Sequence, residues 1–258
     1  MNLLQRALVE KAGHDNGFEY VLPAQNAERV VLASARHAAE VAVEIHEQGF
    51  VAAVTKGSAM LPTELDRSFP GASPNGQTFS LRSEAALSRW LRRAAALAQA
   101  LPNQAVLFFE SQLQAALAAL EPAAAKNTEV LRIVRQRIGQ QAFRQAMLDY
   151  WGAACAVTGI GLPQALRASH AKAWAVCITD AERLDVYNGF LLSANLDALF
   201  DCYLISFSDE GELLIAPSIS AAERVLLGLT AKLRLRWLDK QHLPFLHFHR
   251  AQFSNLDG

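Results

Sequence analysis

Two aspartates in the second half of the chain are spaced to share a cation. Asp197 and Asp201 are four residues apart in a segment with helical spacing, so both carboxylates lie on one side of a helix, one turn apart. The apolar residues Leu196, Leu199 and Phe200 form another face of the same helix. Neighbouring carboxylates repel each other unless something neutralises them. A divalent cation is the natural candidate, and hard oxygen ligands favour Mg²⁺ or Mn²⁺ over Zn²⁺.

Three further polar residues precede this pair. They are Ser169-His170 and Asn188. An imidazole with an ordinary pKa near 6.5 can accept a proton at neutral pH, as a general base does. Each residue also has a plain structural interpretation, since a single histidine in an extended segment is more often structural and an Asn-Gly pair is usually a turn. Those interpretations do not predict all of these residues together in this order.

A local group of basic residues suggests contact with phosphate. The whole chain has a formal net charge of −1, which does not indicate a nucleic-acid partner. Residues 126–150, however, contain five basic residues against Glu129 and Asp149. The five are Lys126, Arg132, Arg135, Arg137 and Arg144. Such a patch can bind phosphates even in a nearly neutral protein, although a solvated helix face explains it equally well.

Composition describes an ordinary globular protein. The 258 residues allow one large domain or two modest ones, and 52% are hydrophobic against 19% charged. Cys155, Cys177 and Cys202 form no CxxC pair, so we expect reduced thiols and a cytoplasmic protein. No apolar run is long enough for a membrane span, and we expect the N-terminus not to be a signal peptide.

The first half of the chain predicts a small sheet with helices. Expected elements are a helix at 2–12, about four strands at 18–22, 29–35, 40–45 and 50–55, a long loop at 57–78, and helices at 83–101 and 104–120. The Pro-containing segment 121–126 is the best linker candidate. We therefore expect an α+β protein whose domains are residues 1–121 and 126–258.

The second half mixes short elements. We expect a helix from Asn127 or Thr128 that pauses at Gly139 and resumes to Trp151. The remaining expected elements are a short strand at 155–159, an extended segment at 166–174, a hairpin of 203–207 and 212–215, a helix at 220–229, a strand at 232–238, and a strand-like end carrying His247 and His249.

Taken together, the second half resembles the HNH endonucleases, and specifically their restriction-enzyme-like branch. The segments that carry the resemblance are Arg137 to Arg144, Cys155 to Gly159, Ala168 to Trp174, Arg183 to Leu192 and Asn195 to Asp201. The resemblance covers about residues 128–215. It implies a fold of two strands and a helix around one metal ion, the ββα-metal finger.

The resemblance implies a role for each polar residue. His170 matches the general base, and Asn188 matches the asparagine that holds the loop and orients the base. Asp197 and Asp201 match metal-ligand positions. Ser169 stands where many relatives have an acidic residue or histidine; a serine hydroxyl is a poor ligand, so it would act through water. Asp197 replaces the histidine of the family name, which is a sensible ligand exchange.

The implied function is metal-dependent hydrolysis of DNA phosphodiester bonds in a restriction or related defence setting. Arg137, Arg144 and Lys172 are the candidate contacts to double-stranded DNA. One metal site cuts one strand at a time, so a homodimer would be a simple way to cut both. Residues 1–121 would recognise DNA; a further possibility is that residues 1–125 bind another protein or a small ligand, with DNA contact confined to the second half. The alternative is a catalytically weak or inactive DNA-binding or regulatory protein that keeps the nuclease scaffold, and Ser169 and Asp197 give it weight.

Overall fold

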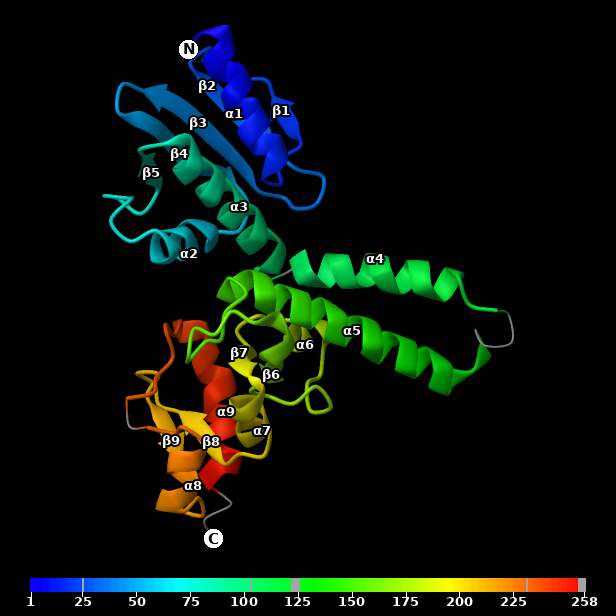
Figure 1. Ribbon diagram of the computed structural model, residues 1–258. Coiled ribbons are helices and arrows are strands. Elements are labelled where there is room, and N and C mark those ends of the chain that lie inside the picture. Colours follow the sequence, from blue (N-terminus) through cyan, green and yellow to red (C-terminus); the bar gives the residue numbers. More distant parts are fainter. Residues whose placement is uncertain (25, 103, 122–125, 231, 255–258) are drawn as a thin grey trace. The chain divides into compact units, whose positions relative to one another are not determined.

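The chain folds into two compact units. The computed structural model describes residues 1–258 apart from 25, 103, 122–125, 231 and 255–258. The units are Met1–Gln104 and Ala105–Gly258 (Figure 1). Their division differs from the expected domains 1–121 and 126–258, because the helix after Gln104 groups with the second unit. Most of the expected linker at 121–126 lies outside the described residues.

An antiparallel sheet of five strands, in the order β1-β2-β3-β4-β5, forms the centre of the first unit. The strands are β1 (Tyr20–Leu22), β2 (Arg29–Ala33), β3 (Glu40–His46), β4 (Gly49–Lys56) and β5 (Thr78–Leu81). Val30 and Leu32 alternate with less buried neighbours and are fully buried, as expected for a strand with one covered face. The small antiparallel sheet that we predicted is confirmed, with one strand more than expected.

Three helices complete this unit: α1 (Leu3–Asp15), α2 (Leu61–Ser68) and α3 (Glu84–Ala100). Ser83 caps α3 by accepting a hydrogen bond from the backbone N–H of Ala86 at 3.2 Å. Both α2 and β5 lie in or at the end of the segment predicted to be a loop, so that prediction was wrong. Pro62 falls in the first turn of α2, where proline is compatible with a helix.

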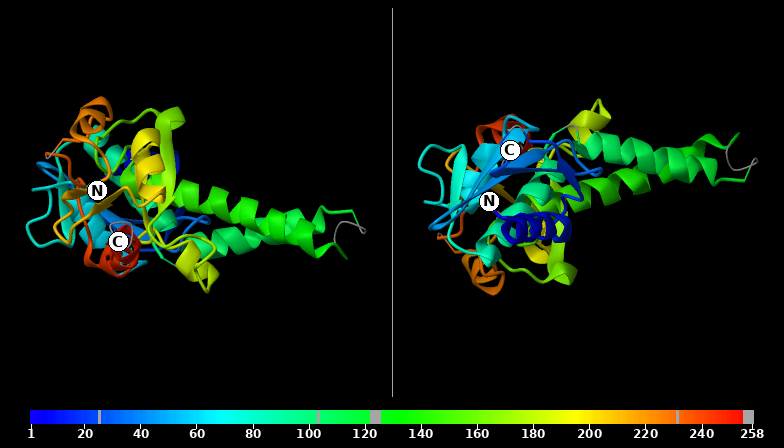
Figure 2. Two further views of the ribbon diagram at one scale, coloured as in Figure 1. Left: turned by 90° about the horizontal axis from the view of Figure 1, so that it is seen from below. Right: turned by 90° about the horizontal axis from the view of Figure 1, so that it is seen from above.

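Two long helices begin the second unit. They are α4 (Gln104–Ala118) and α5 (Thr128–Trp151), which run side by side in both views of Figure 2. Arg135 of α5 lies over the ring of Phe109 of α4, 5.7 Å from its centroid. The predicted pause at Gly139 is wrong, because α5 is continuous. Glycine is needed there for another reason, since a Cβ atom would lie 2.1 Å from the Trp174 ring.

Two strands and a helix follow α5 and form the predicted ββα arrangement. Strand β6 (Leu166–His170) pairs antiparallel with β7 (Gly189–Ser193), and α7 (Ala194–Asp201) begins directly after β7. The remaining elements are η2 (Pro163–Ala165), α6 (Asp180–Arg183), β8 (Ile205–Phe207), β9 (Leu213–Ile215), α8 (Ala221–Leu226), η3 (Lys240–His242) and α9 (Leu243–Ser254). The α+β fold class is therefore confirmed.

Three local predictions in this unit were wrong. Residues 155–159 form turns, and residues 232–238 contribute only an isolated bridge between Glu212 and Arg234. The C-terminal segment is a helix, because Leu246 and His249 are three residues apart and both buried. Within the described residues, no helix is long and apolar enough to cross a membrane.

Candidate active site

A cavity of about 530 Å³ brings four of the eight predicted site residues together, namely Arg144, His170, Asp197 and Asp201. Its walls come from α5, β6 and the loop after it, α7 and α9. The lining residues are Gln140, Phe143, Arg144, Arg167, Ala168, His170, Ala173, Trp174, Asp197, Phe200, Asp201, Tyr203 and His249. The candidate base and both candidate metal ligands therefore face the same space.

His170 is held in one tautomer at the end of β6. Its Nε2 lies 2.9 Å from the main-chain oxygen of Arg183. A carbonyl oxygen only accepts, so Nε2 carries the proton and Nδ1 is left with a free lone pair. The ring stacks on Phe143 with centroids 3.7 Å apart. Burial lowers the pKa of His170 to about 4, so the ring is neutral at pH 7 and able to accept a proton at Nδ1.

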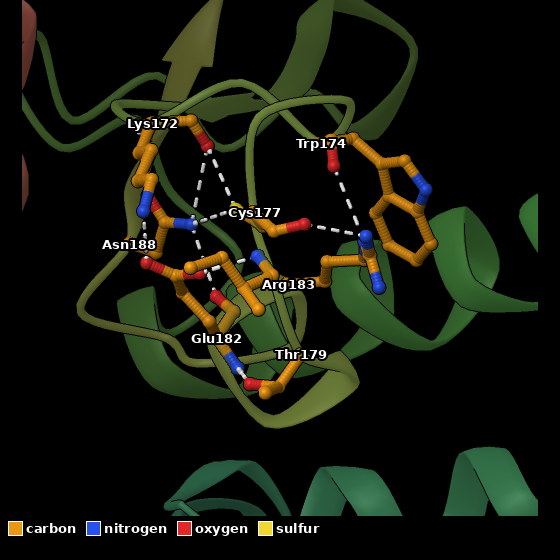
Figure 3. A network of polar contacts seen from close by, with 8 residues as sticks. Lys172, Trp174, Cys177, Thr179, Glu182, Arg183 and Asn188 are labelled. Atoms are coloured by element: carbon orange, nitrogen blue, oxygen red, sulfur yellow. Dashed lines mark hydrogen bonds and ion pairs between the residues drawn. The ribbon is translucent and has the colours of Figure 1, made fainter.

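The carbonyl that orients His170 belongs to a loop that Arg183 itself holds together (Figure 3). The guanidinium of Arg183 donates to the main-chain oxygens of Trp174, at 3.2 Å, and Cys177. It also pairs with Asp180 at 3.0 Å. The sequence did not indicate that Arg183 orients His170, because every residue type has a main-chain carbonyl.

Asn188 is fully buried and ties together the segment between the two strands (Figure 3). Its Oδ1 accepts from the backbone N–H of Lys172 at 2.8 Å. Its Nδ2 donates to the main-chain oxygens of Lys172, at 3.2 Å, and Glu182, at 3.0 Å, and lies 3.3 Å from Cys177 Sγ. Asn188 thus positions the residue next to Arg183, rather than contacting His170 through a hydrogen bond of its own side chain.

The two aspartates lie on α7 as the spacing predicted. Asp197 accepts a hydrogen bond from the hydroxyl of Ser169, which is buried. The pKa of Asp201 is raised to about 6, first because neighbouring protein atoms desolvate its carboxyl and second because the Asp197 carboxylate is close. Asp201 is exposed at one edge, so solvent also reaches it.

This donor set fits a hard divalent cation. The carboxyl of Asp201 makes no hydrogen bond or ion pair with the described residues, and without a positive partner its pKa is raised by burial and by Asp197. The described residues contain no group of three or more His, Cys, Asp and Glu side chains that could hold a metal. Two carboxylates alone suit an ion that keeps several waters, such as Mg²⁺, better than Zn²⁺.

The three basic residues predicted to bind DNA lie in different surroundings. Arg144 lines the cavity and donates to the main-chain oxygens of Leu166, at 2.8 Å, and Pro163, at 3.1 Å. Lys172 is largely buried and pairs with Glu182. Arg137 is exposed on α5, and the cavity lining does not include it.

Sequence reasoning missed one cationic residue of the cavity. Arg167 on β6 is exposed and lines the same space. It lies two residues before Ser169, so the alternation of a strand places both side chains on one face. That alternation was the signal that could have identified it.

One comparison with known proteins identifies this region. Residues 155–208 match the family described as HNH endonuclease. No curated protein matches the chain. The matched segment contains β6, β7 and α7, and with them His170, Asn188 and both aspartates. The chain therefore contains a nuclease-type domain of the HNH endonuclease family.

Proposed function

We propose that the protein is a metal-dependent endonuclease that hydrolyses phosphodiester bonds of double-stranded DNA. The observation that carries this proposal is the shared cavity of His170, Asp197 and Asp201, because the imidazole is neutral and its Nδ1 is not used by the hydrogen bond to Arg183. The HNH match at residues 155–208 supports DNA as the substrate. Metal-dependent hydrolysis of a phosphodiester bond needs a general base and a site that binds a cation.

His170 would take the proton of the attacking water at Nδ1, while Asn188 and Arg183 keep the imidazole oriented. Asp197 and Asp201 would hold Mg²⁺ or Mn²⁺, with Ser169 supporting Asp197 through its hydrogen bond. A bound divalent ion would supply positive charge to the scissile phosphate and the leaving oxygen. A pKa of about 4 keeps the imidazole of His170 neutral at working pH, so that Nδ1 can accept a proton, although it also makes His170 a weak base.

Arg144 and Arg167 would contact phosphates, because both line the cavity beside His170. Arg144 already donates to two carbonyl oxygens, so it would also keep β6 in place. Arg137 would contact the duplex outside the cavity. Lys172 is less suited to direct contact, since its ammonium pairs with Glu182 in a largely buried position.

The wider setting is also a proposal. We place the enzyme in the restriction-enzyme-like branch, acting in the cytoplasm in defence against foreign DNA. Residues 126–258 would carry the nuclease, and residues 1–121 would recognise the DNA. A homodimer would let two single cation sites cut both strands, so nicked plasmid should appear before linear plasmid at low protein concentration.

A catalytically weak or inactive DNA-binding or regulatory protein is the second candidate. The contact between Ser169 and Asp197 favours it, because a hydrogen bond already occupies one ligand oxygen. Incubating supercoiled plasmid with the protein and Mg²⁺ or Mn²⁺, with EDTA as the control, separates the two. Cation-dependent nicking supports the nuclease. Binding without nicking of any DNA, modified DNA included, would support the second candidate.

A further inference from the structure

Tyr203 has a backbone conformation that normally favours glycine. Its φ is 58°, in the left-handed region, and it follows Cys202, the residue that caps α7. The backbone N–H of Leu204 donates to the oxygen of Leu199 at 2.8 Å and closes the end of the helix. Glycine is the usual residue at such a position, because a Cβ atom makes the conformation costly. Tyrosine therefore stabilises the fold less well here than glycine would, unless its side chain contributes something else.

The ring of Tyr203 forms part of the cavity wall. It is partly exposed and shares the cavity with His170, Asp197 and Asp201. Its hydroxyl makes no hydrogen bond to the described residues. A flat, partly apolar surface thus lies in the same cavity as the candidate cation ligands, with a free polar group at its tip.

The ring of Tyr203 packs against His249, which lines the same cavity. The rings of Tyr203 and His249 have centroids 4.8 Å apart. His249 is buried, and its two ring nitrogens contact Ser206 Oγ at 3.0 Å and the main-chain oxygen of Phe200 at 2.9 Å. It also stacks on the Phe200 ring at 3.8 Å. A side chain that packs against a buried, hydrogen-bonded neighbour and is open to the cavity is preorganised for contact with a ligand.

We propose that Tyr203 binds substrate, with its ring packed against the deoxyribose beside the scissile phosphate. This inference rests on the proposed nuclease function. Bases within a duplex are already stacked on their neighbours, whereas the sugars next to a phosphate present an apolar face outward. The position of the Tyr203 ring favours contact with the sugar nearest the scissile phosphate, because the ring shares the cavity with Asp201 and His170. Binding energy from this contact would offset the cost of the left-handed backbone.

The test measures DNA binding without cleavage. In a His170→Ala background with Mg²⁺, a short duplex should bind Tyr203→Gly about tenfold more weakly than the parent, the loss expected when one ring contact is removed. Tyr203→Asn, whose side chain tolerates the left-handed region, should weaken binding to the same extent. Tyr203→Phe should restore binding, because it keeps the ring.

A matched control isolates the backbone effect. Ala153 is the other non-glycine residue with positive φ in the described part of the chain, at 54°, and it does not line the cavity. Ala153→Gly should leave the dissociation constant for DNA unchanged. The glycine and asparagine variants of Tyr203 should have a Tm no lower than the parent's, because both residues suit a positive φ.

Equal dissociation constants for the parent, Tyr203→Gly and Tyr203→Asn would overturn the inference. Weaker binding that only accompanies a lowered Tm in both variants would also overturn it, because the ring would then support the fold rather than the substrate. Failure of the nuclease proposal gives a different result. The wild type would then cut no DNA, whatever the binding of the Tyr203 variants shows.

Discussion

The Nε2 atom of His170 lies 2.9 Å from the main-chain oxygen of Arg183, thirteen residues further along the chain. That contact determines which ring nitrogen is free, and it depends on a loop rather than on the strand that carries His170. Arg183 and Asn188 both bind main-chain oxygens of that loop. The orientation of the candidate base therefore depends on residues that have no chemical role of their own.

The acidic limit of cleavage should follow Asp201 rather than His170. Asp201 has a pKa raised to about 6, so it is ionised above this pH and protonated below it. His170 has a pKa lowered to about 4 and stays neutral across this window. Because a proton and a cation compete for Asp201, a tenfold increase in Mg²⁺ should move the acidic midpoint down by up to about one pH unit. Initial cleavage rates between pH 4.5 and 8, recorded at several Mg²⁺ concentrations, give this acidic midpoint.

Two results would contradict this account of the carboxylates. A midpoint that stays constant as Mg²⁺ is varied would place the titrating group elsewhere. Calorimetric titration should show weak Mg²⁺ binding that Asp201→Ala abolishes, and tight Zn²⁺ binding at this site would show that the ligand set is wrong.

Asn188→Asp should destabilise the second unit by about 3 kcal/mol. The substitution replaces Nδ2, which donates to the main-chain oxygens of Lys172 and Glu182, with an oxygen that repels them. The new charge would also be fully buried. Chemical denaturation measures the loss. Asn127→Asp is the matched control, because aspartate caps a helix about as well as asparagine and α5 should keep its stability.

An Asn188→Asp protein as stable as its Asn127→Asp counterpart would show that the loop does not depend on this amide. Cleavage should fall together with stability, since the carbonyl of Arg183 loses its position when the loop loosens. A destabilised protein with full cleavage activity would argue against the proposed orientation of His170.

Gly139→Ala should lower both stability and cleavage, although alanine favours helix by about 1 kcal/mol in a helix interior. The added Cβ would lie 2.1 Å from Trp174, so the indole must move. Trp174 lines the cavity, and its ring centroid is 5.9 Å from that of His170. Thermal unfolding and plasmid cleavage report the two effects.

Gly161→Ala serves as the control, because a Cβ there meets its nearest atom at an ordinary 3.7 Å. It should change neither Tm nor rate appreciably. A Gly139→Ala protein with raised Tm and full activity would show that Trp174 can move without affecting the site.

Short-range spacing predicted the parts of the site that lie on regular elements. Asp197 and Asp201 share α7, and His170 ends β6, because periodicity and order along the chain carry this information. The carbonyl of Arg183 and the stacking of Phe143 under His170 depend on tertiary packing of segments far apart in sequence. No local pattern encodes them.

The errors of prediction have similar causes. The α2 helix and strand β5 are short and surrounded by proline and glycine, so the turn signals obscured them. In α9, the alternation of histidines with apolar residues is typical of a strand and led to the wrong prediction. The buried residues Leu246 and His249 instead follow helical spacing. The role of Tyr203 was invisible, because its positive φ is a property of the folded backbone.

The central claim is that His170 is the general base of a divalent-metal nuclease. The most direct measurement compares plasmid cleavage by the wild type and His170→Ala, at equal protein occupancy of the DNA and with saturating Mg²⁺ or Mn²⁺. Removing a general base should slow cleavage about 10²- to 10⁴-fold while DNA binding is retained. Cleavage by His170→Ala at the wild-type rate, with the same dependence on the cation, would contradict the claim.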